Sequence, residues 1–209
     1  MAELSYTWWI ANKAKTLFNE PLSAALKTIE PDQERWKKTF RWAEVAESLH
    51  KKLPVVLNAI DATSKKCLPR VHDTTKANLK ILKVQATELQ NEVREALKQY
   101  DNTLQEIGKW QATIYKDVMV TLKHPDPGSL DNLMSECIKM GTCANNKGGL
   151  KHKSFERIVW LGGGSQGGGL YGFCKKLKDA LKKGKKEEIE TWKKGLMGQV
   201  VNLASFQVG

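Results

Sequence analysis

The spacing of apolar residues along the chain predicts helices almost throughout. Apolar side chains recur every three or four positions, which places them on one face of an α-helix. In the first third of the chain this pattern predicts helices over residues 6–18, 22–29, 32–53 and 54–67. We expect Pro31 and Pro54 to lie in first helical turns, because proline lacks the amide hydrogen that a helix interior uses.

The longest pattern is a heptad stripe in the middle of the chain, with no proline between Pro69 and Pro125. It predicts one helix from about Asp73 to His124, which would be roughly 75 Å long. A kink at Gly108 would let a helix of this length fit a compact domain. The stripe itself consists of Leu79, Leu82, Leu89, Val93, Tyr100, Ile107 and Ile114, with Ala86, Ala96, Thr103 and Trp110 at the positions between them. It indicates either the central helix of an antiparallel bundle or an intermolecular coiled coil.

Proline and glycine divide the remainder of the chain. A loop over 124–129 separates a helical body, residues 1–124, from a C-terminal helical subdomain, residues 125–209. In the subdomain we expect a short helix capped by Ser129, a loop over 141–149, and helices over 170–181 and 189–203. The apolar run 155–161 fits a strand or a helical turn. The predicted fold class is all-α, a helical bundle organised around one long central helix.

The charge distribution predicts a positively charged binding surface on this fold. The 209 residues carry 34 Lys+Arg against 23 Asp+Glu, a net charge of +11. From Asn145 onward there are thirteen Lys+Arg against five Asp+Glu, so +8 of the excess lies in the C-terminal third. A positive surface attracts anionic partners such as membrane headgroups or nucleic acid. Only five of the 34 cations are arginine, the residue suited to base-specific contacts, which favours a non-specific anionic surface.

The predicted binding residues are the lysines of the two C-terminal helices, helped by aromatic side chains. Basic amphipathic helices can lie on anionic lipid, and tryptophan is common at that interface. The lysines are Lys175, Lys176, Lys178, Lys182, Lys183, Lys185, Lys186, Lys193 and Lys194, and the interface aromatics are Trp8, Trp9, Trp160 and Trp192. Nucleic acid is the competing partner, through the same lysines with stacking on Trp160, Tyr171 and Phe173.

The glycine-rich loop over 162–169 satisfies G-x-G-x-x-G formally, through Gly162, Gly164 and Gly167. The dinucleotide fingerprint needs a strand before it and a βαβ unit around it, and the remaining 40 or so residues leave no room for one. No Gly-Lys-Ser/Thr follows, which excludes a Walker loop. We therefore interpret the loop as a flexible hinge. The alternative is an engineered Gly/Ser linker that replaces a native loop.

The cysteines and histidines form no convincing metal or catalytic set. Cys137, Cys143, His152 and Cys174 are the imaginable zinc ligands, but structural zinc sites use close pairs two to four residues apart, and the nearest pair here is separated by five. Four cysteines are sparse for a disulfide scaffold, so we expect free thiols, with a Cys137–Cys143 bridge only in an oxidising compartment. The histidines show no H-E-x-x-H or triad context, and there is no G-x-S-x-G. We expect no metal, no cofactor and no small-molecule substrate.

The chain shows no signal for export or membrane insertion. Met1-Ala2-Glu3 begins no secretory signal, Ala2 excludes myristoylation, and no stretch of about 18 apolar residues exists. We therefore expect a cytoplasmic protein, with peripheral membrane contact open. The functional hypothesis is a non-enzymatic structural or assembly protein, matrix- or capsid-like or a membrane effector, that self-associates and engages an anionic surface through its basic C-terminal third. A nucleocapsid-like protein and a small enzyme without a recognisable motif are the alternatives.

Overall fold

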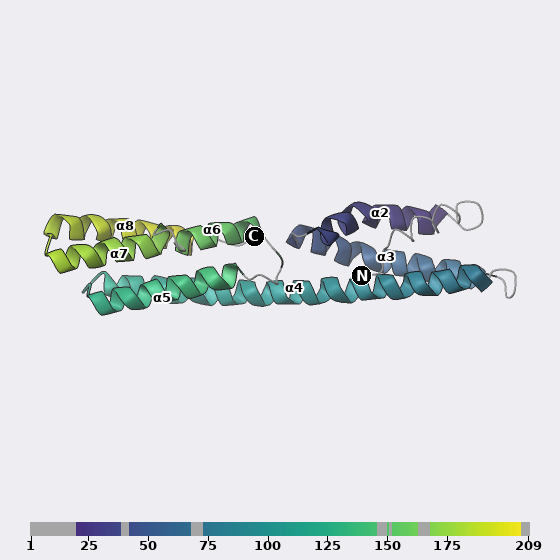
Figure 1. The fold of residues 1–209 in the computed structure, drawn as a ribbon, viewed down its shortest axis with the longest axis horizontal. Coiled ribbons are helices and arrows are strands. Elements are labelled where there is room, and N and C mark those ends of the chain that lie inside the picture. The colour runs from purple at the N-terminus through teal and green to yellow at the C-terminus, as the bar shows by residue number, and fades with distance from the viewer. Residues whose placement is uncertain are drawn as a thin grey trace. The chain divides into compact units, whose positions relative to one another are not determined.

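The computed structural model of the chain is helical in the parts that it describes (Figure 1). These parts are residues 20–38, 42–67, 73–145, 150, 152–162 and 168–205. The helices are α2 (Glu20–Lys37), α3 (Ala43–Lys66), α4 (Asp73–Thr121), α5 (Pro127–Ala144), α6 (Lys153–Gly162), α7 (Gly169–Lys183) and α8 (Lys186–Ala204). The all-α class and the long central helix are thus confirmed. The helix predicted over 6–18 lies outside the described residues.

The chain divides into two compact units within α4, between Gln99 and Tyr100. The sequence places the boundary in the 124–129 loop, because proline and glycine gather there. In the structure that loop is a turn inside the second unit, joining α4 to α5. A continuous helix shared by two cores offers no break in composition for a sequence reading to find.

The first unit consists of α2, α3 and the first part of α4. α2 and α3 pack against each other, and Lys83 of α4 forms an ion pair with Asp61 of α3 at 2.7 Å. Its core is made of apolar side chains that recur at helical spacing on each of the three helices. The core includes Leu22, Leu26, Ile29, Leu49, Leu53, Val56, Ile60, Leu79, Leu82 and Val93.

Two prolines that we expected to begin helices lie inside them, so that prediction is wrong. α2 continues through Pro31 to Lys37, and α3 continues through Pro54 to Lys66. Both prolines are exposed. A proline on the solvent side of a helix loses one hydrogen bond, but the carbonyl left without that partner can bond to water.

The second unit consists of the last part of α4 and helices α5 to α8. α5 packs against both α6 and α7, and α7 packs against α8 (Figure 1). The amide Nε2 of Gln111 on α4 donates to the carbonyl oxygen of Leu203 on α8 at 3.0 Å, which fixes the end of α8 against α4. Every helix gives apolar side chains to the core, among them Ile107, Ile114, Leu130, Leu133, Met140, Ile158, Leu161, Leu170, Leu177, Leu196 and Val200.

The start and the length of α5 differ from the prediction. Its N-cap is Asp126, whose carboxylate accepts from the amides of Gly128 at 2.9 Å and Ser129 at 3.0 Å. The Ser129 hydroxyl also donates to this carboxylate. These hydrogen bonds lower the pKa of Asp126 below its usual value, and the bond from the Ser129 hydroxyl has the largest effect. α5 then runs on to Ala144, through the Gly141 that we had taken as the start of a loop.

A buried carboxylate links α2 to α3 in the first unit. Asp32 accepts hydrogen bonds from the Ser48 hydroxyl and from Lys52 Nζ, both at 2.7 Å. Burial raises the pKa of Asp32, but the hydrogen bonds from Lys52 and Ser48 and the charges of Lys52 and Arg35 outweigh it, so the pKa lies below the usual 3.8. The ionised form is therefore favoured in the folded state.

We predict that Asp32→Asn lowers the free energy of unfolding by about 1–2 kcal/mol at neutral pH, because the charge-assisted pair with Lys52 is lost at a largely buried site. Since the folded pKa is lowered, this contribution is present above the unfolded pKa of about 3.9 and disappears as the pH falls through the folded value. Asp61→Asn is the control, because the Asp61 side chain is 45% exposed, and its effect should stay within about 0.5 kcal/mol. Equal effects in urea unfolding would contradict the prediction.

Candidate functional site

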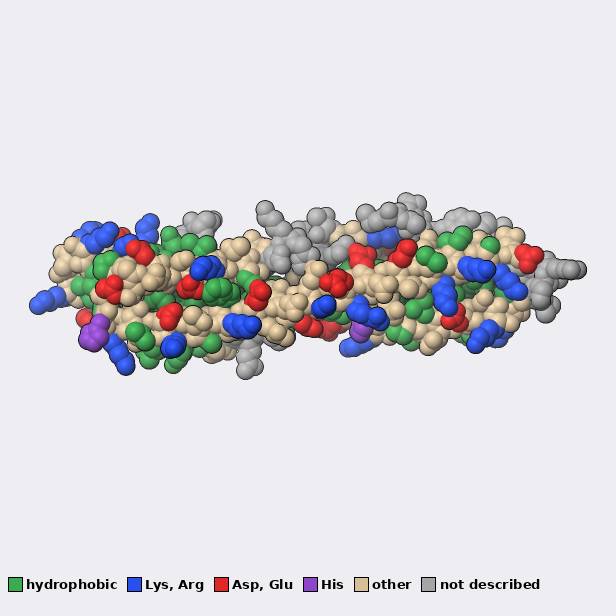
Figure 2. Space-filling view, turned by 90° about the horizontal axis from the view of Figure 1, so that it is seen from below, with side chains coloured by type: hydrophobic (Ala, Val, Ile, Leu, Met, Phe, Trp, Pro, Cys, Tyr) green, Lys and Arg blue, Asp and Glu red, His purple; other side chains and the backbone are tan. Residues whose placement is uncertain are grey.

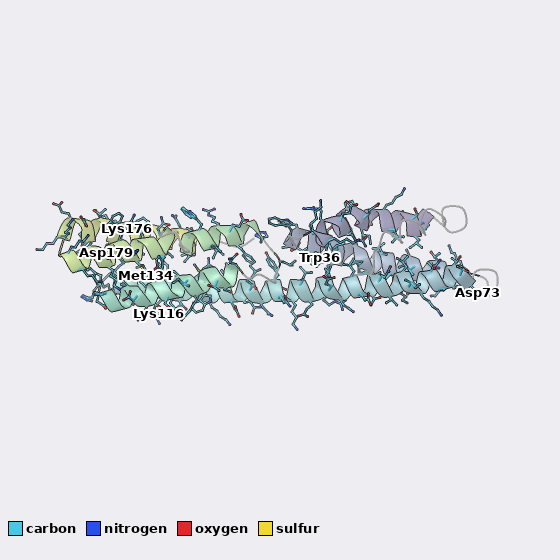
Figure 3. The ribbon with its side chains drawn as sticks, in the orientation of Figure 1. Trp36, Asp73, Lys116, Met134, Lys176 and Asp179 are labelled. Atoms are coloured by element: carbon cyan, nitrogen blue, oxygen red, sulfur yellow. The ribbon has the colours of Figure 1, made fainter. Side chains whose placement is uncertain are left out.

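The candidate site is the solvent face of α7. Leu170, Cys174 and Leu177 turn one side of this helix into the core. Helical spacing then places the opposite side in water, and its exposed residues are Lys175, Lys176, Asp179, Lys182 and Lys183. Four cations and one anion share a surface about 12 Å long, at 1.5 Å per residue. Figure 3 marks Lys176 and Asp179 on this helix.

None of the four lysines on this face has an ion pair with another described residue. Of the other five predicted lysines, three form ion pairs: Lys178 reaches across to Asp131 of α5, Lys185 pairs with Glu188 at 2.6 Å, and Lys193 pairs with Glu190 at 3.1 Å. Lys186 and Lys194, on α8, have no ion pair with a described residue either. We call the four unpaired lysines of α7, Lys175, Lys176, Lys182 and Lys183, the α7 lysine face.

α8 carries little net charge of its own. Its three lysines, Lys186, Lys193 and Lys194, are matched by three glutamates, Glu187, Glu188 and Glu190. α7 has five lysines and a single aspartate. The positive charge that the sequence assigned to both C-terminal helices is thus concentrated on α7.

The two compact units carry similar net charges. Residues 1–99 hold seventeen Lys+Arg against twelve Asp+Glu, or +5, and residues 100–209 hold seventeen against eleven, or +6. The second unit includes the acidic part of α4 and α5, which offsets the basic tail. On the face seen in Figure 2, basic and acidic side chains are interspersed along both units. The α7 lysine face is therefore a local feature of the second unit.

An aromatic pair supports one edge of the lysine face. The rings of Phe173 and Trp192 meet edge-on, with centroids 5.9 Å apart, and join α7 to α8. Lys176 Nζ lies 4.6 Å from the Trp192 ring centroid, within the range of a cation–π contact. Gly195 makes room for this arrangement, because a Cβ atom there would lie 2.2 Å from Cε1 of Phe173. The cation is thus held over the ring without losing its exposure.

The other predicted aromatics are not gathered at this place. Trp192 is only half-buried and is engaged with Phe173 and Lys176. Trp160 on α6 is 65% exposed, the largest exposed fraction among the large apolar residues described. Trp8 and Trp9 lie outside the described residues.

The heptad stripe is used within the chain. Leu79, Leu82, Leu89 and Val93 are buried in the first unit, and Tyr100, Ile107 and Ile114 are buried in the second. Tyr100 stacks at an angle on Phe155 of α6, with centroids 5.5 Å apart. Because these seven side chains are buried within the chain, they are not exposed for an intermolecular coiled coil.

The described cysteines are free thiols, so no Cys137–Cys143 bridge is present. Burial raises the pKa of Cys137 to about 12 and that of Cys174 further. Desolvation, then a hydrogen bond to Glu106 and its charge, raises the pKa of Cys143 to about 11. A thiolate is the reactive form and the metal ligand, so none of these three is an activated nucleophile at neutral pH. Among the described residues no three His, Cys, Asp or Glu side chains are placed to hold a metal ion.

The ends of the glycine-rich loop have a packing role. Gly169 has a φ of 53°, and a Cβ there would lie 2.2 Å from the carbonyl oxygen of Leu161. Gly162 lies against the Cys137 carbonyl oxygen, where a Cβ would approach to 3.2 Å. The run before the loop, 157–161, belongs to α6, which removes the strand that a dinucleotide site requires. Gly164 and Gly167 lie outside the described residues.

Sequence reasoning missed the partners that separate paired lysines from unpaired ones. Lys178 and Asp131 are 47 positions apart, and no periodicity relates them. The pairs Lys185–Glu188 and Lys193–Glu190 could have been found, because residues three apart on a helix are neighbours. The close packing at Gly195 could not have been found from the sequence, because Gly198 on the same helix is also an isolated glycine and nothing lies within 4 Å of a Cβ there.

We predict that Gly195→Ala destabilises the protein by about 1–2 kcal/mol, because the added methyl group must displace the Phe173 ring. Gly198→Ala on the same helix is the matched control, since a Cβ there meets nothing within 4 Å. That change should stabilise the protein by about 0.5–1 kcal/mol through the helix preference of alanine. Thermal unfolding measures both, and a stabilising Gly195→Ala would show that the Phe173–Trp192 pair is not fixed as described.

Comparison with known proteins adds no relationship to this picture. No family model, no curated protein and no solved structure matches the chain. A proposal of function therefore has to rest on the α7 lysine face and on the chemistry of the residues around it.

Proposed function

We propose that this protein is a non-enzymatic helical protein that binds an anionic membrane surface through the α7 lysine face. The observation that carries the proposal is the set of four exposed lysines on one side of α7, without ion-pair partners among the described residues. Such a surface offers point charges to many phosphates at once, without selecting among them. Within the C-terminal region, the net positive charge on which this proposal depends lies on α7.

The attraction that such a face supplies can be estimated. A lysine held near an anionic leaflet contributes about 1 kcal/mol. Four lysines on a surface about 12 Å long would act together, because they lie within roughly one or two Debye lengths of one another. This is enough for reversible peripheral binding. No described helix is long and apolar enough to cross a bilayer.

An aromatic ring lies beside the cations of the face. Lys176 rests on Trp192, within the range of a cation–π contact. The same unit also exposes the apolar residues Trp160, Met197 and Val201. Self-association is left out of the proposal, because the stripe that suggested it is buried within the chain.

Nucleic acid is the competing partner, and the composition of the face favours membrane over it. The α7 lysine face contains no arginine. Of the three aromatics considered for base stacking, Phe173 is packed against Trp192 and Tyr171 is half-buried, so only Trp160 presents a largely exposed ring. Single-strand binders generally stack several successive bases.

Co-sedimentation with vesicles tests the proposal. The protein should sediment with phosphatidylserine-containing vesicles at low salt, and much less with pure phosphatidylcholine vesicles. Replacing Lys175, Lys176, Lys182 and Lys183 together by glutamine should lower the partition coefficient at low salt by on the order of a thousandfold, because each lysine contributes about 1 kcal/mol.

The control replaces four exposed lysines of the first unit, Lys37, Lys65, Lys66 and Lys80, by glutamine, which changes the net charge equally. It should lower binding only weakly. Equal losses in the two variants would show that net charge, not the α7 face, drives binding. No preference for anionic vesicles, together with a gel shift of RNA that needs the α7 lysines, would replace the membrane proposal with the nucleic-acid one.

A further inference from the structure

An apolar groove runs along α5 in the second unit, on the side where α6 and the start of α7 face it. One part is an open hollow of about 440 Å³, lined by Cys137, Ile138, Gly141, Thr142, Asn145, Val159 and Tyr171. A second open hollow, of about 220 Å³, is lined by Ala144, Asn145, Leu150, His152, Phe155, Glu156 and Val159. The two hollows share Asn145 and Val159 and therefore adjoin, and we call them together the α5–α6 groove.

Residues at helical spacing form both walls of the groove. On one side Cys137 and Gly141 of α5 are followed by its C-cap Asn145, and on the other His152, just before α6, is followed by Phe155 and Val159 of α6. Gly141 lies in the middle of the α5 wall, and a Cβ atom there would meet nothing within 4 Å. The missing side chain leaves open space in the groove rather than relieving a clash.

One end of the groove adjoins positive charge. Tyr171 lines the groove, and Lys175 lies one helical turn further along the same side of α7. Neither side chain has a hydrogen bond or ion pair with another described residue. The two carboxylates of α5 are already paired, Asp131 with Lys178 and Glu136 with Lys139. Glu156 lies in the other part of the groove, so an anionic group is favoured at the Tyr171 end.

We propose that the α5–α6 groove binds one long-chain fatty carboxylate, with its alkyl chain along α5 and its carboxylate at Tyr171 and Lys175. The larger part lies within the size range of small-molecule pockets, and its walls are mainly apolar. A peptide backbone is a poorer fit there, because among the side chains of this part only Thr142, Asn145 and Tyr171 carry oxygen or nitrogen atoms that could pair with its amides. The carboxylate can accept a hydrogen bond from the Tyr171 hydroxyl and an ion pair from Lys175.

This inference goes beyond the proposed membrane binding and needs no bilayer. It shares Lys175 with the α7 lysine face, but the groove residues are otherwise separate. Palmitate binding without vesicle binding would overturn only the membrane proposal, and vesicle binding without palmitate binding would overturn only this one.

The test is displacement of a fluorescent long-chain fatty acid by monomeric palmitate from the purified full chain. Saturable binding to one site is expected. Gly141→Ala should weaken it, and Gly141→Leu should weaken it by about tenfold or more, because the added side chain fills the groove. Gly108→Ala and Gly108→Leu are matched controls on α4, where a Cβ also meets nothing within 4 Å, and they should bind as the unmodified chain does.

Competitors with different head groups test the charged end of the groove. Hexadecanol, with the same chain and no charge, should compete more weakly than palmitate, and Lys175→Gln should reduce this difference. Octanoate, with the same charge and a short chain, should compete least. The graded series at position 141 keeps the test informative if the leucine variant folds poorly, as circular dichroism would show. No saturable binding, or binding that is insensitive to both substitutions at Gly141, would overturn the proposal.

Discussion

The burial of the α4 stripe is the interaction on which the remainder of the structure depends. Seven large side chains from Leu79 to Ile114 are removed from water, and they belong to the cores of two different units. Fully burying each contributes about 1.5–3 kcal/mol, so neither core could lose its part of α4 and remain stable. The same burial means that the stripe itself contributes no surface for binding.

In the second unit, the neighbouring helices α7 and α8 differ in how their surface charge is balanced. α7 and α8 both turn apolar residues inward, but α8 matches its lysines with glutamates and α7 does not. A helix with unmatched cations on its solvent side loses stability by self-repulsion, unless an anion is bound or the charges are far enough apart. The C-terminal end of α7 partly offsets this cost, because Lys182 and Lys183 lie at the negative end of the helix dipole.

Much of the fold was readable from periodicity, and the errors have identifiable physical causes. The span of α4, the break at Gly184 and the apolar sides of α7 and α8 follow from three-to-four spacing, which depends only on local sequence. The continuation through Pro31 and Pro54 depends on which side of the helix faces water, and that is set by tertiary packing. The ion pairs of the lysines divide in the same way. The Lys193–Glu190 pair could be predicted from helical spacing, whereas the Lys178–Asp131 pair depends on how α7 packs against α5. The α5–α6 groove had no signal at all, because its residues lie on three helices.

Lys175 connects the two binding proposals, and the sign of the connection follows from charge. A carboxylate held at Lys175 would neutralise one of the four cations of the α7 lysine face, and so weaken attraction to an anionic membrane. Thermodynamic linkage makes the effect reciprocal, so a bound anionic membrane would weaken fatty-carboxylate binding by the same factor. With about 1 kcal/mol per lysine near a surface, the expected factor is about fivefold. An uncharged alcohol in the same groove leaves Lys175 free, so only the charged ligand should oppose membrane binding.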